Sequence, residues 1–115
     1  METIIEIYWQ DSKLRKHCSS ARQGQKRWGA DGWKILSRRL AVMEAAPTLA
    51  SLENTPGNFH ALTADRAGEF AVSLWRGYRL VFEPSDDPLP FDGAGNLVRD
   101  QITRVRIKEV VDYHG

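Results

Sequence analysis

The chain has 115 residues, of which 42% are hydrophobic and 27% charged, and its formal net charge is +1. This size and composition suit one globular domain, residues 1–115, and exclude a disordered or disulfide-linked chain, because Cys18 is the single cysteine. No apolar run approaches the ~20 residues that span a membrane, and no signal-peptide pattern opens the chain, so we expect a cytoplasmic protein with no membrane partner.

The first half of the sequence predicts a strand and then a helix. Residues 2–9, ETIIEIYW, are rich in β-branched and aromatic side chains, which favour a strand. Residues 11–28 predict a helix with Asp11 or Ser12 as its N-cap. The segment GAD at residues 29–31 is expected to interrupt this helix and to start the next one.

A second helix is expected at residues 32–46. Its apolar residues form one stripe at helical spacing, made of Trp33, Leu36, Leu40 and Met43. Pro47 ends this helix, and residues 48–57 have room for one short helical turn. The stripe is therefore expected to face the core.

The second half of the sequence changes to alternating patterns that predict strands. Residues 69–75, EFAVSLW, and residues 78–83, YRLVFE, predict a hairpin with a tight turn at Arg76–Gly77. Residues 101–114 predict the last strand, in which apolar and basic residues alternate.

Residues 84–100, PSDDPLPFDGAGNLVRD, predict a long loop tipped by a small hairpin at residues 93–96. The order of elements predicts an α+β domain, with two N-terminal helices packed on one face of a small, mainly antiparallel sheet.

Positive charge is concentrated in the two expected helices. Residues 12–42 contain nine Lys or Arg side chains against one acid, Asp31. Such a block can attract phosphate groups, and it can equally be a solvated helical face.

Three histidines are candidates for proton transfer: His17 in the basic helix, His60 before the hairpin and His114 near the end of the chain. Two histidines with an Arg and a Tyr can cleave RNA. One group takes the proton of the 2′-hydroxyl, another protonates the 5′-leaving oxygen, and the guanidinium holds the phosphate. Metal binding by Cys18 and the three histidines is a weaker reading, because Cys18 directly follows His17, which is an unusual ligand spacing.

Two segments carry a resemblance to a known family. The stretch NFHALTADRAGEFAVSLWRGYRLVFEP and the final IKEVVDYHG resemble the HigB-like branch of the RelE/ParE toxin superfamily, whose pattern includes a loop His, GDRKG, YRxxF and a terminal DYH. The resemblance runs from Leu36 to the end of the chain. It implies the compact RelE/ParE-like α+β fold that the order of elements also predicts.

The resemblance implies a toxin that cleaves mRNA on the translating ribosome, without metal or cofactor, leaving 2′,3′-cyclic phosphate ends. It also implies a neutralising antitoxin, often a HigA-like protein with a helix-turn-helix domain. The implied catalytic residues are His60, Arg79, Asp112, Tyr113 and His114. The expected contacts to RNA or ribosome are Lys13, Arg15, Lys16, Lys34, Arg38, Arg66 and Arg76.

The sequence departs from the family pattern at three positions. Thr63 and Ala67 stand where lysines are common, and Ser73 stands where a basic residue is common. Fewer cations near the scissile phosphate imply lower activity, a different dependence on the ribosome or a changed target.

Several alternatives remain open at this point. The fold is shared by gyrase-poisoning toxins, and a non-catalytic binding protein is a further possibility. Arg79 can instead pair with Glu83 or Asp112, Asp112 can orient a histidine rather than act on RNA, and Tyr113 can pack at the edge of the core. The four tryptophans are expected in or near the core rather than stacked on bases: Trp9, Trp28, Trp33 and Trp75.

Overall fold

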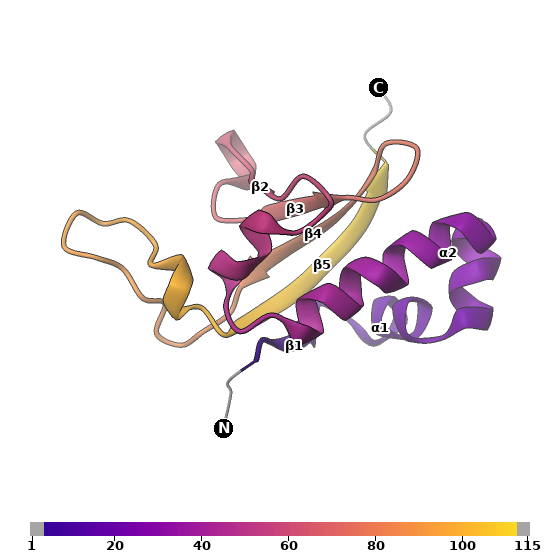
Figure 1. The fold of residues 1–115 in the computed structure, drawn as a ribbon, viewed down its shortest axis with the longest axis horizontal. Helices are drawn as coiled ribbons and strands as arrows, with labels where there is room; N and C mark the ends of the chain where they lie inside the picture. Colours follow the sequence, from indigo (N-terminus) through magenta and orange to yellow (C-terminus); the bar gives the residue numbers. More distant parts are fainter. Residues whose placement is uncertain (1–3, 113–115) are drawn as a thin grey trace.

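The computed structural model describes residues 4–112, which form a five-stranded sheet in the order β1-β5-β4-β3-β2, with helices packed on one face (Figure 1). Within this described range, no helix is both long enough and apolar enough to cross a membrane. The strands are β1 (Glu6–Trp9), β2 (His60–Ala61), β3 (Phe70–Ser73), β4 (Tyr78–Pro84) and β5 (Arg104–Asp112). The helices are α1 (Ser12–Ser19) and α2 (Ala21–Ala45), with 3₁₀ turns at Leu49–Asn54, Ala64–Arg66 and Arg99–Gln101.

The sheet is mainly antiparallel, as the sequence predicts, and its one parallel pair joins β1 to β5. The description of α1 and α2 as the N-terminal elements is wrong in one respect, because β1 precedes them. β1 lies at the edge of the sheet and pairs with β5, with Ile7 opposite Val105. Ile5, just before β1, is buried in the core. Burying these apolar side chains stabilises the pairing.

The first predicted helix is divided at Ser20. Ser20 has extended backbone angles, ends α1 and caps α2, because its hydroxyl accepts a hydrogen bond from the backbone N–H of Gln23. The predicted interruption at residues 29–31 occurs at Gly29, whose backbone is non-helical, and helical geometry resumes directly after it. The basic segment therefore consists of three helical pieces, separated by the breaks at Ser20 and Gly29.

The apolar stripe of α2 faces the sheet. Leu36, Leu40 and Met43 are buried there and pack in one core with Leu80 and Phe82 of β4. Each such side chain contributes roughly 1.5–3 kcal/mol when fully buried. The predicted stripe is thus confirmed, and it fixes α2 across the strands that carry the candidate site.

Both turn predictions in the second half are confirmed. Arg76 and Gly77 have positive φ values of 48° and 79°, and the N–H of Tyr78 donates to the carbonyl of Trp75, which closes the tight turn between β3 and β4. In the long loop, Phe91 pairs with Leu97 around the small hairpin.

Three of the four tryptophans lie against the core, as expected, and Trp75 does not. Trp9, Trp28 and Trp33 are partly buried and pack against it. Trp75 stacks on Tyr78 with ring centroids 4.6 Å apart.

Candidate active site

The candidate site lies on the face of the sheet that is turned away from the core. Side chains alternate along a strand, so residues next to the core positions Leu80 and Phe70 belong to the opposite face. On that outer face, His60 of β2 pairs in register with Ala71, and Arg79 of β4 lies between Ser73 and Val111. The two candidate catalytic residues thus come from strands two positions apart in the sheet.

His60 and Arg79 are in direct contact. A terminal nitrogen of Arg79, Nη1, lies 3.0 Å from Nε2 of His60, and Nδ1 of His60 lies 2.8 Å from the carbonyl oxygen of Asn58. A carbonyl can only accept and a guanidinium can only donate. These partners therefore select the neutral imidazole with its hydrogen on Nδ1 and a lone pair on Nε2.

Asn58, which the sequence reasoning missed, orients the ring that the resemblance singled out. Asn58 has a φ of 51°, in the left-handed region that Asn tolerates better than most residues, and it follows Gly57 with a φ of 116°. The signal in the sequence is the Pro-Gly-Asn segment two residues before His60. This turn aims the Asn58 carbonyl back at the imidazole.

A chain of contacts ties this turn to α2. The backbone N–H of Ser73 donates to the carbonyl of Gly57 over 2.6 Å, and the Nε of Arg39 donates to the carbonyl of Ser73 over 3.1 Å. Arg39 therefore links the helix to the turn that positions His60. Ser73 stands where the family pattern has a basic residue, and here its backbone N–H and carbonyl make the contacts that link Gly57 to Arg39.

Replacing Gly57 with alanine is expected to displace the His60 turn. A Cβ at this position would lie 2.8 Å from Nε of Arg39, and the φ of 116° strains any L side chain. We expect the free energy of unfolding to fall by about 1–3 kcal/mol, and the RNA cleavage that the resemblance implies to fall about tenfold or more. Thermal unfolding and cleavage assays measure both. Gly93→Ala is the matched control, because its Cβ would meet no atom within 4 Å, and it should change neither quantity.

Arg66, predicted to contact RNA, forms a network with two carboxylates. Its nitrogens lie 2.6 Å from Glu69 and 2.7 Å from Glu109, which pairs with Val81 on the outer face. The hydrogen bond with Glu109, and to a smaller extent the one with Glu69, raises the pKa of Arg66 above its usual value. Arg66 thus connects its 3₁₀ turn to β5, and contact with RNA stays a prediction.

The end of β5 carries the last described candidate. Asp112 pairs in register with Tyr78, so alternation assigns it to the face of Val110 rather than to that of Arg79. The ring of His60 is oriented by the Asn58 carbonyl. Tyr113 and His114 lie outside the described residues, and their catalytic role stays a prediction.

The alternative partner Glu83 is engaged elsewhere. Its carboxylate lies 3.4 Å from Arg106 and 3.7 Å from Lys108 on the neighbouring strand. The structure therefore gives Arg79 a histidine contact, and the predicted pairing with Glu83 does not form.

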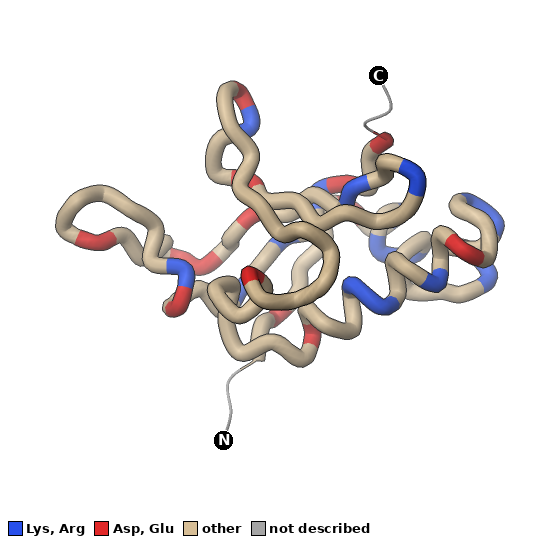
Figure 2. The backbone as a smooth tube through the Cα atoms, turned by 45° about the horizontal axis from the view of Figure 1, so that its top comes forward, with Lys and Arg blue, Asp and Glu red and all other residues tan. Residues whose placement is uncertain are grey.

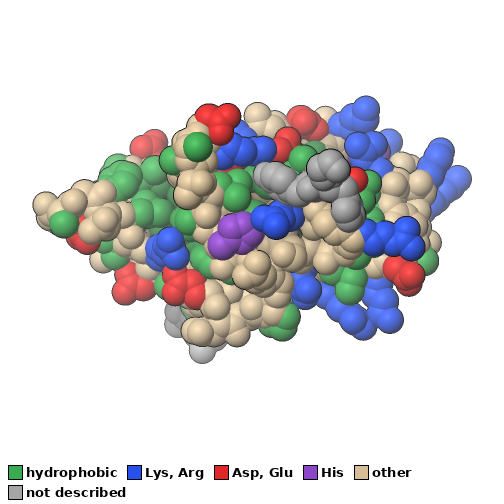
Figure 3. All heavy atoms as spheres, turned by 90° about the horizontal axis from the view of Figure 1, so that it is seen from above, with side chains coloured by type: hydrophobic (Ala, Val, Ile, Leu, Met, Phe, Trp, Pro, Cys, Tyr) green, Lys and Arg blue, Asp and Glu red, His purple; other side chains and the backbone are tan. Residues whose placement is uncertain are grey.

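The remaining predicted RNA contacts are exposed. Figure 2 shows Lys and Arg concentrated along α1 and α2 and at the turn of the β3–β4 hairpin, while Asp and Glu are spread over the other elements. The view in Figure 3 shows basic side chains gathered at the helical end of the molecule and apolar ones toward the long loop. The exposed residues are Lys13, Arg15, Lys16, Lys34, Arg38 and Arg76.

The described residues of the metal hypothesis, His17, Cys18 and His60, form no metal-binding cluster. Cys18 is buried in the core, and burial raises the pKa of its thiol to about 12. Over residues 4–112, no three His, Cys, Asp or Glu side chains are close enough to hold a metal ion.

Solved structures share this fold. No protein-family model matches the sequence, and comparison with curated proteins found no match. The YoeB–YefM complex from Staphylococcus aureus matches with a TM-score of 0.57 at 14% identity, covering 96% of this chain and 98% of that chain. A YoeB/ParE toxin from Agrobacterium tumefaciens matches with a TM-score of 0.57 at 13% identity, covering 96% and 100%. The YoeB dimer from Staphylococcus aureus has a TM-score of 0.53 at 15% identity, covering 96% and 98%.

These matches identify the class of fold first: a mixed α+β domain whose five-stranded sheet carries its helices on one face. More particularly, the fold is similar to that of YoeB and YoeB/ParE toxins. The expected α+β fold is thereby confirmed, and membership of the RelE/ParE superfamily and of its HigB-like branch stays a prediction.

Proposed function

We propose that the chain is the toxin of a type II toxin–antitoxin system and that it cleaves mRNA as a metal-independent endoribonuclease. The observation that carries the proposal is the contact between His60 and Arg79 on the outer face of the sheet. A lone pair on imidazole next to a guanidinium supplies a proton acceptor and a phosphate-binding cation within one short distance. The fold of YoeB and YoeB/ParE toxins supports the same assignment.

In the proposed reaction, the guanidinium of Arg79 first moves from Nε2 of His60 to the phosphate oxygens, which exposes the lone pair of Nε2. Nε2 then takes the proton of a ribose 2′-hydroxyl. The oxygen attacks the adjacent phosphorus, the bond to the 5′-oxygen breaks, and that oxygen receives a proton from Tyr113 or His114. The products are a 2′,3′-cyclic phosphate and a 5′-hydroxyl.

The proposal includes a protein partner and a place of action. One structure with this fold is a complex of YoeB with YefM, which supports a cognate antitoxin for this chain, and we propose one of the HigA-like helix-turn-helix type. The basic side chains on α1 and α2 suit the ribosome as the site of cleavage, in the cytoplasm.

A gyrase-poisoning activity is the second candidate, since one match is named a YoeB/ParE toxin. Two assays on the purified chain separate the candidates: cleavage of an mRNA in a translation extract, and inhibition of supercoiling by gyrase. The proposal predicts mRNA fragments and normal supercoiling, with cleavage lost in His60→Ala. Inhibited supercoiling with intact mRNA would establish the second candidate instead.

A further inference from the structure

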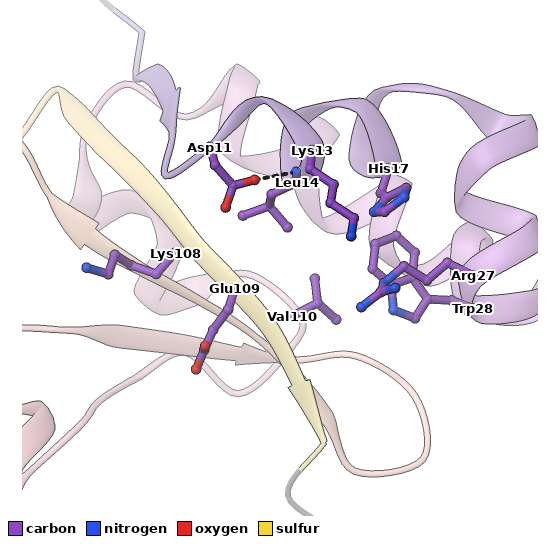
Figure 4. Close-up of a pocket in the computed structure, with 9 residues that line it drawn as sticks. All are labelled: Asp11, Lys13, Leu14, His17, Arg27, Trp28, Lys108, Glu109 and Val110. Atoms are coloured by element: carbon purple, nitrogen blue, oxygen red, sulfur yellow. Dashed lines mark hydrogen bonds between the residues drawn. The ribbon is translucent and has the colours of Figure 1, made fainter.

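A basic cavity separate from His60 lies between α1, α2 and β5. Its volume is about 370 Å³, within the usual range for small-ligand sites. Figure 4 shows the side chains of Lys13, His17 and Arg27 around this space, with Trp28 beside them and Val110 below. The cavity thus combines nitrogen donors with an apolar wall.

Its cations are available to an anion. Lys13 and Arg27 are exposed and take part in none of the ion pairs found among residues 4–112. The carboxylate of Asp11, the acid nearest to them, accepts the backbone N–H of Leu14 and caps α1. Positive charge in the cavity is therefore only partly compensated.

Two other charged residues line the cavity but are engaged on neighbouring strands. Glu109 pairs with Arg66, and Lys108 lies 3.7 Å from Glu83. Figure 4 shows both side chains pointing away from α1. The charged side chains that face the space between the helices and Val110 are therefore those on α1 and α2.

The aromatic groups make this cavity different from a simple cationic patch. His17 and Trp28 lie edge to face with ring centroids 6.2 Å apart, and the guanidinium carbon of Arg27 lies 5.7 Å from the Trp28 ring. Burial, followed by the nearby Arg27 and Lys13, lowers the pKa of His17. A planar base can stack on such rings while a phosphate meets the cations.

A second hollow shares residues with this cavity. A space of about 350 Å³ shares His17 and Arg27 with it and adds Lys26. Val110 pairs with Leu80, so alternation assigns it to the face opposite to that of Arg79, and the cavity and the catalytic pair lie on opposite faces of the sheet. The cavity is therefore a site of its own.

We propose that this cavity binds one nucleotide of single-stranded RNA on the helix face of the sheet, with its base against Trp28 and its phosphate on Lys13 and Arg27. The inference rests on the proposed function for its ligand, and it adds a second binding site to the catalytic one. A nucleotide is favoured over an acidic peptide because the wall of the cavity is aromatic and the guanidinium lies over a ring.

The test measures binding without cleavage. The probe is a fluorescent oligonucleotide of about ten nucleotides with 2′-O-methyl riboses, which lack the attacking hydroxyl, and affinity is read by anisotropy. We expect Trp28→Leu to weaken binding about fivefold or more, the size of one lost base stack. Arg27→Ala is expected to reduce the slope of log Kd against log salt by about 0.7, the value for one lost phosphate contact.

Control variants separate the possible outcomes. Trp28 packs partly against the core, so the exposed pair Lys13→Ala with Arg27→Ala tests the cavity without that risk. Arg22→Ala is the matched control, since Arg22 is exposed on the same helical piece and lines neither hollow. An equal loss in Arg22→Ala would reduce the effect to general charge attraction and overturn the proposal.

Two further results would also overturn it: unchanged affinity in the cavity variants, or displacement of the probe by polyglutamate with no effect of Trp28→Leu. The second result would assign the cavity to an acidic peptide. Because the probe cannot be cleaved, binding at the cavity is scored even if the chain is no nuclease. The experiment therefore distinguishes a failure of the proposed nucleotide binding from a failure of the proposed catalysis.

Discussion

A chain that ends at Asp112 is expected to fold like the parent and to lose RNA cleavage by a factor of about 10²–10⁴ or more. The deleted residues are Tyr113, His114 and Gly115. The resemblance assigns proton transfer to this segment, and His60 alone supplies one of the two proton-transfer groups that the reaction requires. Removing the other group leaves the 5′-oxygen to depart without a proton.

Stability should hardly change in that truncated chain. The fully buried residues of β5, Val105 and Ile107, precede the deletion, as does the pairing of Asp112 with Tyr78. Their burial, roughly 1.5–3 kcal/mol for each fully buried side chain, is retained. Cleavage assays and circular dichroism on the purified chains measure the two properties.

A chain that lacks only Gly115 is the matched control for the truncation, and it should keep full activity. If the truncated chain is folded and cleaves RNA like the parent, the role given to Tyr113 and His114 is wrong. If it is unfolded, the segment is structural, and single substitutions of Tyr113 and His114 then decide whether it also has a catalytic role.

Arg79→Ala is expected to lower cleavage about a hundredfold, which corresponds to about 3 kcal/mol of lost transition-state stabilisation. The guanidinium stabilises charge that develops on the phosphate oxygens, and no other cation lies within hydrogen-bond distance of His60 among residues 4–112. Arg79→Lys should restore cleavage only in part, because an ammonium cannot bind two oxygens as a fork.

A double variant tests whether Arg79 acts together with His60. Since their nitrogens are 3.0 Å apart, the effects of Arg79→Ala and His60→Ala on cleavage should be less than additive. Arg106→Ala, on the neighbouring strand and paired with Glu83, is the matched loss of an arginine and should leave cleavage unchanged. A structural role for Arg79 predicts the opposite pattern: a lower melting temperature, with normal cleavage by the protein that remains folded.

The sequence predicted elements wherever the local pattern determines the local structure. The tight turn at Arg76–Gly77 follows from residues that tolerate or favour positive φ, and the stripe of α2 follows from helical spacing. The break at Ser20 was missed although Ser20 and Gln23 have the spacing of a capping box, which marks the start of a helix. The parallel pairing of β1 with β5 joins residues about a hundred positions apart, and no local pattern encodes that choice.

The sequence supplied candidate residues for the site and not the geometry that relates them. The resemblance singled out His60 and Arg79, and the fold brings them into contact across β3. The orienting carbonyl of Asn58 depends on backbone angles that the sequence only suggests. The pairing of Arg66 with Glu109 joins residues 43 positions apart, so their charges alone gave no reason to connect them.

The most direct test of the proposed catalysis is the chemistry of the RNA ends made by the purified chain in excess EDTA. We expect fragments with a 2′,3′-cyclic phosphate and a 5′-hydroxyl, formed at the same rate with or without EDTA and absent with His60→Ala. Fragments with a 5′-phosphate, or cleavage that stops in EDTA and returns with magnesium, would contradict proton transfer by His60 as the basis of the reaction.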